Sequence, residues 1–116
     1  MEEILSYSNF NWESPPGFDE GIEQVVIKNT LDETNKVGVR TRFVRFNAGA
    51  KTSIKFIHDY HEEVYLIEGD QILLDAEKLS PLKKFGTGEY FLRPAGTYHG
   101  PFTSETGCLL LEIHYY

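Results

Sequence analysis

The chain has 116 residues, of which 41% are hydrophobic and 14% aromatic, and its formal net charge is −7. This length supports one domain with a single core, and the aromatic content is typical of a folded protein and not of a disordered tail. The eleven Lys and Arg residues are spread along an acidic chain, which argues against a nucleic-acid partner, because phosphate binding needs concentrated positive charge.

The chain lacks the usual signals for secretion or membrane insertion. Its first residues, Met-Glu-Glu-Ile-Leu-Ser-Tyr-Ser, have neither the basic start nor the apolar run of a signal peptide. No stretch approaches the roughly 20 apolar residues that a membrane-spanning helix needs. The single cysteine, Cys108, can form no internal disulfide and is predicted to be a small core residue. We therefore expect a cytoplasmic protein without a membrane partner.

The segments along the chain are predicted to be strands almost throughout. Residues 1–21 are polar, contain Pro15-Pro16-Gly17, and are expected to form an extended arm that packs Trp12 against the body. Segments rich in Val, Ile, Phe, Tyr and Thr follow, at residues 23–28, 37–47, 51–56, 62–68, 71–75, 89–93 and 108–115. Several short strands at regular spacing predict an all-β domain, a sandwich or barrel, over residues 22–116.

The connections between these segments carry the residues of tight turns. Gly69-Asp70 and Gly86-Thr87-Gly88 separate neighbouring segments, as expected between antiparallel strands. Only residues 75–84 could hold a short helical turn, and Pro81 interrupts it.

Imidazole and carboxylate groups lie at the ends of two of the predicted strands. In the first segment, side chains two apart on a strand share a face, so His58 and Glu62 point the same way while His61 points oppositely. A turn or bulge before Glu62 would reset this alternation, which keeps His61 open as a candidate. Phe56 shares the face of His58 and brings an aromatic ring to a place where another ligand could stand.

The second polar segment ends at His99. Pro94 withholds a backbone donor and Gly96 permits an unusual φ, so the chain is expected to turn there and to present His99 at a strand edge. Two histidines and one carboxylate converging from different strands would form a facial triad with open coordination positions. This combination points to a metal held inside a barrel.

Two further sets of polar side chains lie on predicted strands. Arg40, Arg42 and Arg45 occupy both faces of one strand, so at least one faces the interior or a dimer interface, where it could clamp a substrate carboxylate. Glu112 and His114 share one face of the last strand. For these two, a solvent-facing polar stripe is favoured over a place in the site.

The first polar segment resembles the first motif of the cupin superfamily, G(x)5HxH(x)3–4E(x)6G. His58, Glu62 and Gly69 match this motif from its second histidine onward. Phe56 stands where the first histidine of the motif falls, and Gly49 lies one residue earlier than the upstream glycine. One of the four usual ligands of the family is therefore missing.

The second polar segment resembles the second cupin motif, G(x)5PxG(x)2H(x)3N. Gly88, Pro94, Gly96 and His99 match it, and Thr103 replaces its final asparagine. The residues in and around both motifs look most like those of the ChrR-like cupins and their small single-domain relatives. The resemblance implies an all-β, single-domain cupin-type antiparallel jelly-roll barrel.

The resemblance also implies a divalent metal ion. Its ligands would be His58, Glu62 and His99, with His61 as a substitute fourth ligand. For two imidazoles and one carboxylate we expect Fe(II) or Zn(II), ahead of Mn(II) or Ni(II), because affinity order alone does not decide which ion a site holds in a cell.

Two classes of function follow from the resemblance. The first is a small metal-dependent enzyme, dioxygenase-like, that acts on a small organic acid or phenolic compound. The second is a non-catalytic cupin module that binds or senses zinc or a small ligand, and a metal-free isomerase pocket is favoured only if Phe56 fills the metal position. The expected partners are a small-molecule ligand or substrate and a second copy in a homodimer, because apolar residues occupy both faces of several strands.

Overall fold

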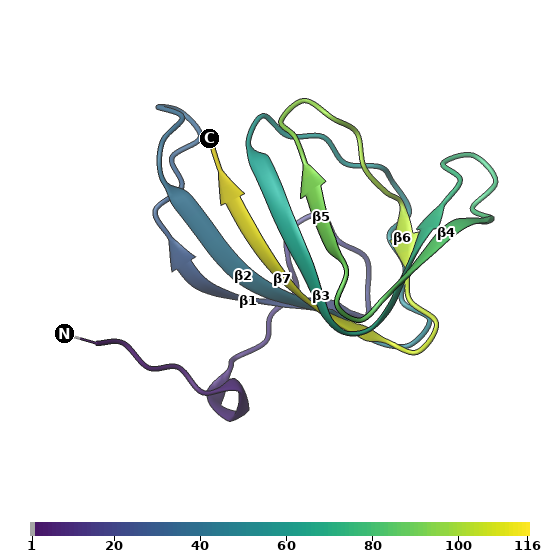
Figure 1. Cartoon of the computed structure of the whole chain (residues 1–116), viewed down its shortest axis with the longest axis horizontal. Helices are drawn as coiled ribbons and strands as arrows, with labels where there is room; N and C mark the ends of the chain where they lie inside the picture. Colours follow the sequence, from purple (N-terminus) through teal and green to yellow (C-terminus); the bar gives the residue numbers. More distant parts are fainter. Residues whose placement is uncertain (1) are drawn as a thin grey trace.

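The computed structural model describes residues 2–116 and is built almost entirely of β-strands (Figure 1). One 3₁₀ turn, η1 (Tyr7–Asn9), precedes the strands β1 (Ile22–Asn29), β2 (Val39–Phe46), β3 (His61–Leu74), β4 (Pro81–Gly86), β5 (Tyr90–Arg93), β6 (Phe102–Thr103) and β7 (Cys108–Tyr115). All pairings between these strands are antiparallel, which confirms the prediction of an all-β antiparallel fold. Within residues 2–116, no helix has the length and hydropathy needed to cross a membrane.

The long strand β3 holds the fold together. The sheet order is β1-β2-β7-β3-β4, and β5 and β6 also pair with β3. The first half of β3 pairs with β7 and β5, and its second half pairs with β4 and β6. In Figure 1, β1, β2, β7, β3 and β5 therefore run side by side as one curved layer, while β4 and β6 lie apart from it.

β3 changes its partners at Gly69, which has a φ of +89°. A Cβ atom at this position would lie 2.0 Å from the carbonyl oxygen of Gly107, so only glycine permits the approach. The side chain of the next residue, Asp70, accepts hydrogen bonds from the backbone N–H groups of Glu105 and Thr106. The prediction of a turn at Gly69-Asp70 is therefore wrong, because the two segments form one continuous, bent strand.

Two other predicted elements differ from the structure. Residues 51–56 form no regular strand and reach the body through isolated bridges, including one from Phe56 to His99. Strand β4 takes up the later part of residues 75–84, the segment that could have held a short helical turn. Pro81 begins this strand, where its missing amide N–H costs no ladder hydrogen bond.

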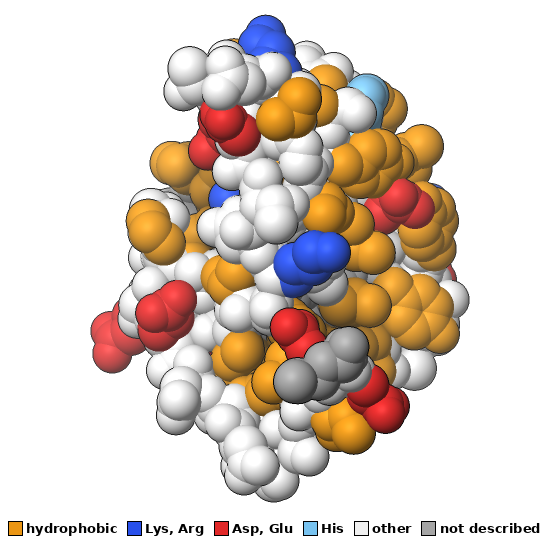
Figure 2. Space-filling model, turned by 90° about the vertical axis from the view of Figure 1, so that its left-hand side faces the viewer, with side chains coloured by type: hydrophobic (Ala, Val, Ile, Leu, Met, Phe, Trp, Pro, Cys, Tyr) orange, Lys and Arg blue, Asp and Glu red, His pale blue; other side chains and the backbone are white. Residues whose placement is uncertain are grey.

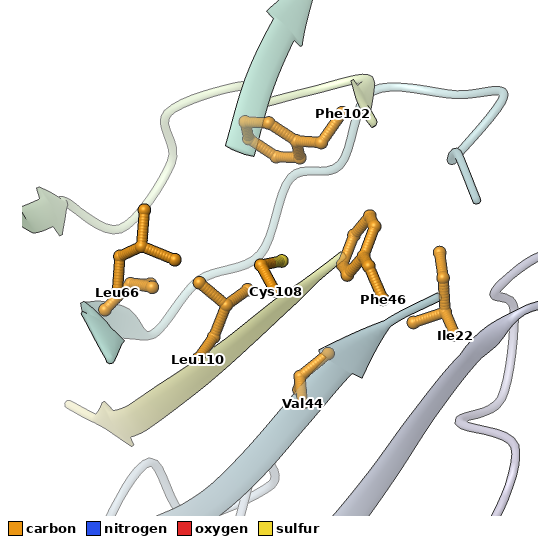
Figure 3. Close-up of a cluster of buried hydrophobic side chains, with 8 residues drawn as sticks. Ile22, Val44, Phe46, Leu66, Phe102, Cys108 and Leu110 are labelled. Carbon is orange, nitrogen blue, oxygen red and sulfur yellow. The ribbon is translucent and has the colours of Figure 1, made fainter. Parts of the chain in front are cut away.

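Inward-facing side chains divide the barrel into an apolar end and a polar end. Along β7, every second residue is buried, beginning with Cys108 and Leu110 and ending with Glu112 and His114. Cys108 is a buried free thiol, as predicted, and burial raises its pKa to about 11. The apolar end holds the core cluster of Figure 3, which includes Ile22, Val44, Phe46, Leu66, Phe102, Cys108 and Leu110.

The N-terminal arm packs against the same chain. The guanidinium carbon of Arg45 lies 4.0 Å from the centre of the Trp12 ring, so the expected packing of Trp12 against the body is confirmed. Further along, the ring of Phe18 stacks on that of Phe56 with 5.0 Å between their centres. The division into an arm (residues 1–21) and a barrel (residues 22–116) stays a prediction.

The outward side of the sheet exposes large hydrophobic side chains. Tyr65, Tyr90 and Leu92 are 44%, 55% and 54% exposed, and Tyr65 lies directly opposite Tyr90 across β3 and β5. Hydrophobic side chains also gather over much of the face seen in Figure 2, on the side of β1 and the N-terminal arm. The expected homodimer would need such a surface.

Candidate metal centre

A cavity of about 750 Å³ occupies the polar end of the barrel. Side chains of β1, β2, β3, β5 and β7 line it, together with the irregular segments 16–18 and 54–60. The stacked rings of Phe18 and Phe56 form an apolar part of its wall. A cavity of this size can enclose a small organic molecule.

Polar side chains form one row across four neighbouring strands on the inner face of the barrel, and Arg40, Glu62 and Arg93 of this row line the cavity. Arg40 on β2 lies opposite His114 on β7, and His114 lies opposite Glu62 on β3. Glu62 in turn lies opposite Arg93 on β5. Opposite residues of antiparallel strands share a face and have Cβ atoms about 5 Å apart, so the strand register alone brings these side chains into contact.

Glu62 is the centre of this row and is 3% exposed. Its Oε1 accepts a hydrogen bond from Arg93 Nη1 at 2.8 Å, and its Oε2 accepts one from His114 Nε2 at 2.6 Å. Burial and the charge of Glu112 raise the pKa of Glu62, but the hydrogen bond from His114 and the charge of Arg93 outweigh them and bring it below its ordinary value. Glu62 is therefore an ionised carboxylate at neutral pH.

His58 and His99 reach Glu62 from irregular segments. The Nδ1 atom of His58 lies 2.8 Å from the backbone carbonyl oxygen of Tyr60, and Nδ1 of His99 lies 3.4 Å from that of Thr97. Because a carbonyl only accepts, we assign the ring proton to Nδ1 in both histidines. The unprotonated Nε2 atoms are then free to bind a metal, an arrangement common among metal-ligating histidines.

Both imidazoles are neutral at neutral pH. Burial lowers the pKa of His58, and burial together with the charge of Arg93 lowers the pKa of His99 to about 4. His58 Nε2 lies 3.9 Å from Glu62 Oε2, and His99 Nε2 lies 3.8 Å from Glu62 Oε1. The buried Nε2 of His58 has no hydrogen-bond partner within residues 2–116, so its lone pair is available.

The donor atoms of His58, Glu62 and His99 fit one divalent ion. They all lie within 4.8 Å of one another. Metal–ligand bonds of about 2.1 Å place two ligands of one ion at most about 4.2 Å apart. The distance from His58 Nε2 to Oε2 of Glu62 and that from His99 Nε2 to Oε1 of Glu62 both meet this limit. Each oxygen of Glu62 also keeps a lone pair beyond the hydrogen bond that it accepts. The structure thus brings together the three residues that the motif spacing singled out.

His61, the expected substitute for a fourth ligand, lies outside this cluster. Its Nδ1 accepts a hydrogen bond from the backbone N–H of Ala95 at 3.1 Å, and its ring centre lies 5.5 Å from that of Tyr115. Because β3 already begins at His61, strand alternation turns His61 to the face opposite Glu62. The structure therefore does not bring His61 together with His58, Glu62 and His99.

Phe56 occupies the place of the missing first histidine of the motif. Its ring lies 5.0 Å from that of Phe18 and 6.0 Å from that of His99, so it adds an apolar wall beside the candidate ligands. With Phe56 in this position, three protein ligands would leave coordination positions for a substrate.

Glu112 and His114 are buried parts of the site, and the expectation of a solvent-facing stripe is wrong. They are 5% and 0% exposed. Arg42 Nη2 lies 2.7 Å from Glu112 Oε1, and this charge holds the pKa of Glu112 well below its usual range although burial raises it. The sequence did contain a signal for their burial, because strand alternation places both on the face of Cys108 and Leu110.

His114 connects Glu62 to Arg40. Arg40 Nε donates a hydrogen bond to His114 Nδ1 at 2.9 Å, so in this geometry the proton of His114 lies on Nε2 and is donated to Glu62. Although burial lowers it, the nearby carboxylates of Glu112 and Glu62 raise the pKa of His114, and a second proton would have to displace Arg40 from Nδ1. Arg40 Nη2 donates to the hydroxyl of Tyr60 at 3.0 Å.

Comparisons with known proteins identify similar architectures. No protein-family model matches the sequence, and no curated protein is significantly similar to it. The solved structure of the polyketide cyclase RemF from Streptomyces resistomycificus matches with a TM-score of 0.76 and 19% identity, over 98% of this chain and 79% of that one. An acetylacetone dioxygenase from Acinetobacter johnsonii matches with a TM-score of 0.74 and 19% identity, over 99% of this chain and 74% of that one.

A third match includes a larger share of the other protein's chain. An RmlC-like cupin from Shewanella frigidimarina matches with a TM-score of 0.71 and 18% identity, over 98% of this chain and 90% of that one. These similarities confirm the predicted jelly-roll barrel. At such identities they show the fold alone, so activity and substrate have to be argued from the site.

Proposed function

We propose that this chain, which has the cupin fold, is a metal-dependent enzyme that acts on a small organic acid or phenolic compound. The observation that carries the proposal is the convergence of two neutral imidazoles, His58 and His99, on the ionised carboxylate of Glu62 inside a cavity of about 750 Å³. The fold supports it as well, because the solved structures that share it include a polyketide cyclase and an acetylacetone dioxygenase.

The proposed ligands would hold one divalent ion, Fe(II) or Zn(II) ahead of Mn(II) or Ni(II). When bound, such an ion offers open positions to substrate oxygen atoms and polarises them. Arg93 and His114 keep Glu62 ionised and fix its orientation. The rings of Phe18 and Phe56 cover the cavity wall beside His99 and exclude water from it.

The same cavity supports the proposed class of substrate. Its apolar wall of aromatic rings suits a phenyl ring or a short carbon chain. Arginine side chains line its polar side, where they can bind a carboxylate or a phenolate oxygen.

One observation favours a second candidate, a non-catalytic cupin module that binds zinc or a small ligand. Both oxygens of Glu62 already accept hydrogen bonds, from Arg93 and from His114, so this carboxylate is satisfied without an ion. A satisfied network of this kind stabilises a pocket whether or not the pocket performs a reaction.

Oxygen uptake and product analysis distinguish the two candidates. Protein loaded in turn with Fe(II), Zn(II), Mn(II) or Ni(II) is incubated with a panel of small carboxylic acids and phenols, and products are followed by mass spectrometry. Turnover that the His58→Ala variant loses supports the enzyme. Zinc held tightly by the purified protein, with no turnover of any panel member under any of the four ions, would contradict it and support the binding module.

A further inference from the structure

We infer that Arg40 anchors the carboxylate of an anionic substrate in the cavity and so determines specificity for acids. This role deepens the proposed function and rests on the cavity being the substrate site. The evidence for this role is the pattern of charges and hydrogen bonds of the arginines on β2 and β5.

The other arginines near the cavity are already paired with carboxylates. Arg42 Nη2 lies 2.7 Å from Glu112, and Arg93 Nη1 lies 2.8 Å from Glu62. Both acids are buried, so these pairs are held in place and their charges balance. Arg45, on the outward face of β2, pairs with Glu23 at 2.9 Å and does not line the cavity.

Arg40 differs because neither of its side-chain partners is a carboxylate. Its guanidinium donates to Nδ1 of His114 and to the hydroxyl of Tyr60. In the part of the chain that the structure describes, residues 2–116, no ion pair joins Arg40 to a carboxylate.

The inner cavity therefore has an excess of positive charge. Three guanidinium groups, those of Arg40, Arg42 and Arg93, face only two buried carboxylates. Glu13 and Glu33 also line the cavity, but both are exposed residues whose charges are screened by solvent. An ion on the proposed ligands would add to the excess, so an anionic ligand is the one that neutralises this space.

The donors of Arg40 are positioned for such an anion. The Nε–H and one of the two N–H groups of Nη2 are occupied, whereas Nη1 makes no hydrogen bond within residues 2–116. The edge formed by Nη1 and the second N–H of Nη2 is therefore left for a carboxylate. Tyr60 connects this edge to the ligand set, because its ring stacks on that of His58 with 3.9 Å between their centres. Only β7 separates β2 from β3, so the backbones of Arg40 and Glu62 lie about 10 Å apart, a span that a small acid can bridge.

Calorimetric titration with benzoate and with the neutral, equally sized benzamide tests the inference. The protein is titrated both as purified and after loading with Zn(II), for the wild type, Arg40→Gln and the matched control Arg45→Gln on the outward face of the same strand. We expect benzoate to bind at least ten times more tightly than benzamide. Arg40→Gln should lose this preference by a factor of ten or more, and Arg45→Gln should keep it.

Metal analysis and two further measurements separate this inference from the proposed function. A failure to hold metal overturns the proposed function, whereas loss of the benzoate preference in metal-free Arg40→Gln still supports the anchor. If Arg40→Gln does not fold, the uncharged Arg40→Met replaces it, and the Nε–H signal of Arg40 is followed by NMR in the wild type, where benzoate should shift it. Unchanged benzoate binding in a folded Arg40 variant, equal binding of benzoate and benzamide, no benzoate binding, or an unshifted Arg40 signal would each overturn the inference.

Discussion

Glu62 accepts hydrogen bonds from Arg93 and His114 while two imidazole nitrogens lie 3.8 Å and 3.9 Å from its oxygens. A substitution of Glu62 would therefore change the charge network and the candidate ligand set together. Residues that belong to only one of the two give clearer tests. Arg42 belongs to the charge network alone, because its carboxylate partner is Glu112.

At the residue scale, Arg42→Met should lower the free energy of unfolding by about 3–5 kcal/mol, because it leaves Glu112 buried without its partner. Arg45→Met is the matched control, since its pair with Glu23 is about one-third exposed on both sides. The control should lose about 1 kcal/mol or less. Urea denaturation measures both, and equal losses in the two variants would contradict the assigned network.

Part of this site could be predicted from the sequence, because motif spacing is readable there directly, whereas burial is indicated only by strand alternation. His58, Glu62 and His99 stand at the spacing of a known family and lie together in the structure. His114 belongs to no motif, and only its alternation with buried residues of β7 indicated its place. The placement of His61 depended on where β3 begins, a boundary that strand propensity alone does not define.

At the scale of elements, β3 determines the architecture by pairing with four strands. Gly-Asp is a common turn pair, so local sequence predicts a turn at the Gly69 bend. The tertiary contact with Gly107 that keeps the strand continuous is not visible in local sequence. Local sequence does not predict strand β4 for a similar reason, since five of its six residues pair with β3 but most of the strand is exposed.

Asp70 stabilises this bend, and its contribution should depend on pH. Although burial raises it, hydrogen bonds from Thr106 and Glu105 lower the pKa of Asp70 to about 2, from an ordinary value of 3.8. The folded state therefore favours the ionised form, so the stabilisation is complete well above pH 3.8 and disappears as the pH falls through about 2.

Asp70→Asn should accordingly lower the free energy of unfolding by about 2 kcal/mol at pH 7, and this difference from the wild type should shrink between pH 5 and pH 2. Denaturant unfolding across this pH range measures the effect. Asp75→Asn, in an exposed turn, is the control and should cost less. A difference for Asp70→Asn that is constant with pH would show that its charge does not stabilise the bend.

At the scale of the whole molecule, the barrel separates an apolar core from a polar cavity, and its outward face remains uncovered. The homodimer stays a prediction, and substitutions on this face can test it. Light scattering should give about twice the chain mass of 13.3 kDa for the wild type. Tyr65→Lys, in the exposed cluster with Tyr90 and Leu92, should reduce it to one chain, whereas Leu82→Lys on β4 should not. A wild-type mass of 13.3 kDa would contradict the prediction.

The metal content of the protein tests the central claim most directly. Wild type, His99→Ala and the control His61→Ala are purified without chelator and without nickel affinity chromatography, and their metals are quantified by elemental analysis. His61 is a matched control because it precedes Glu62 on β3 but faces away from the cluster. We predict about one divalent ion per chain in the wild type and in His61→Ala, and loss of most of it in His99→Ala. Equal metal in His99→Ala and the wild type, or no metal in either, would contradict the account.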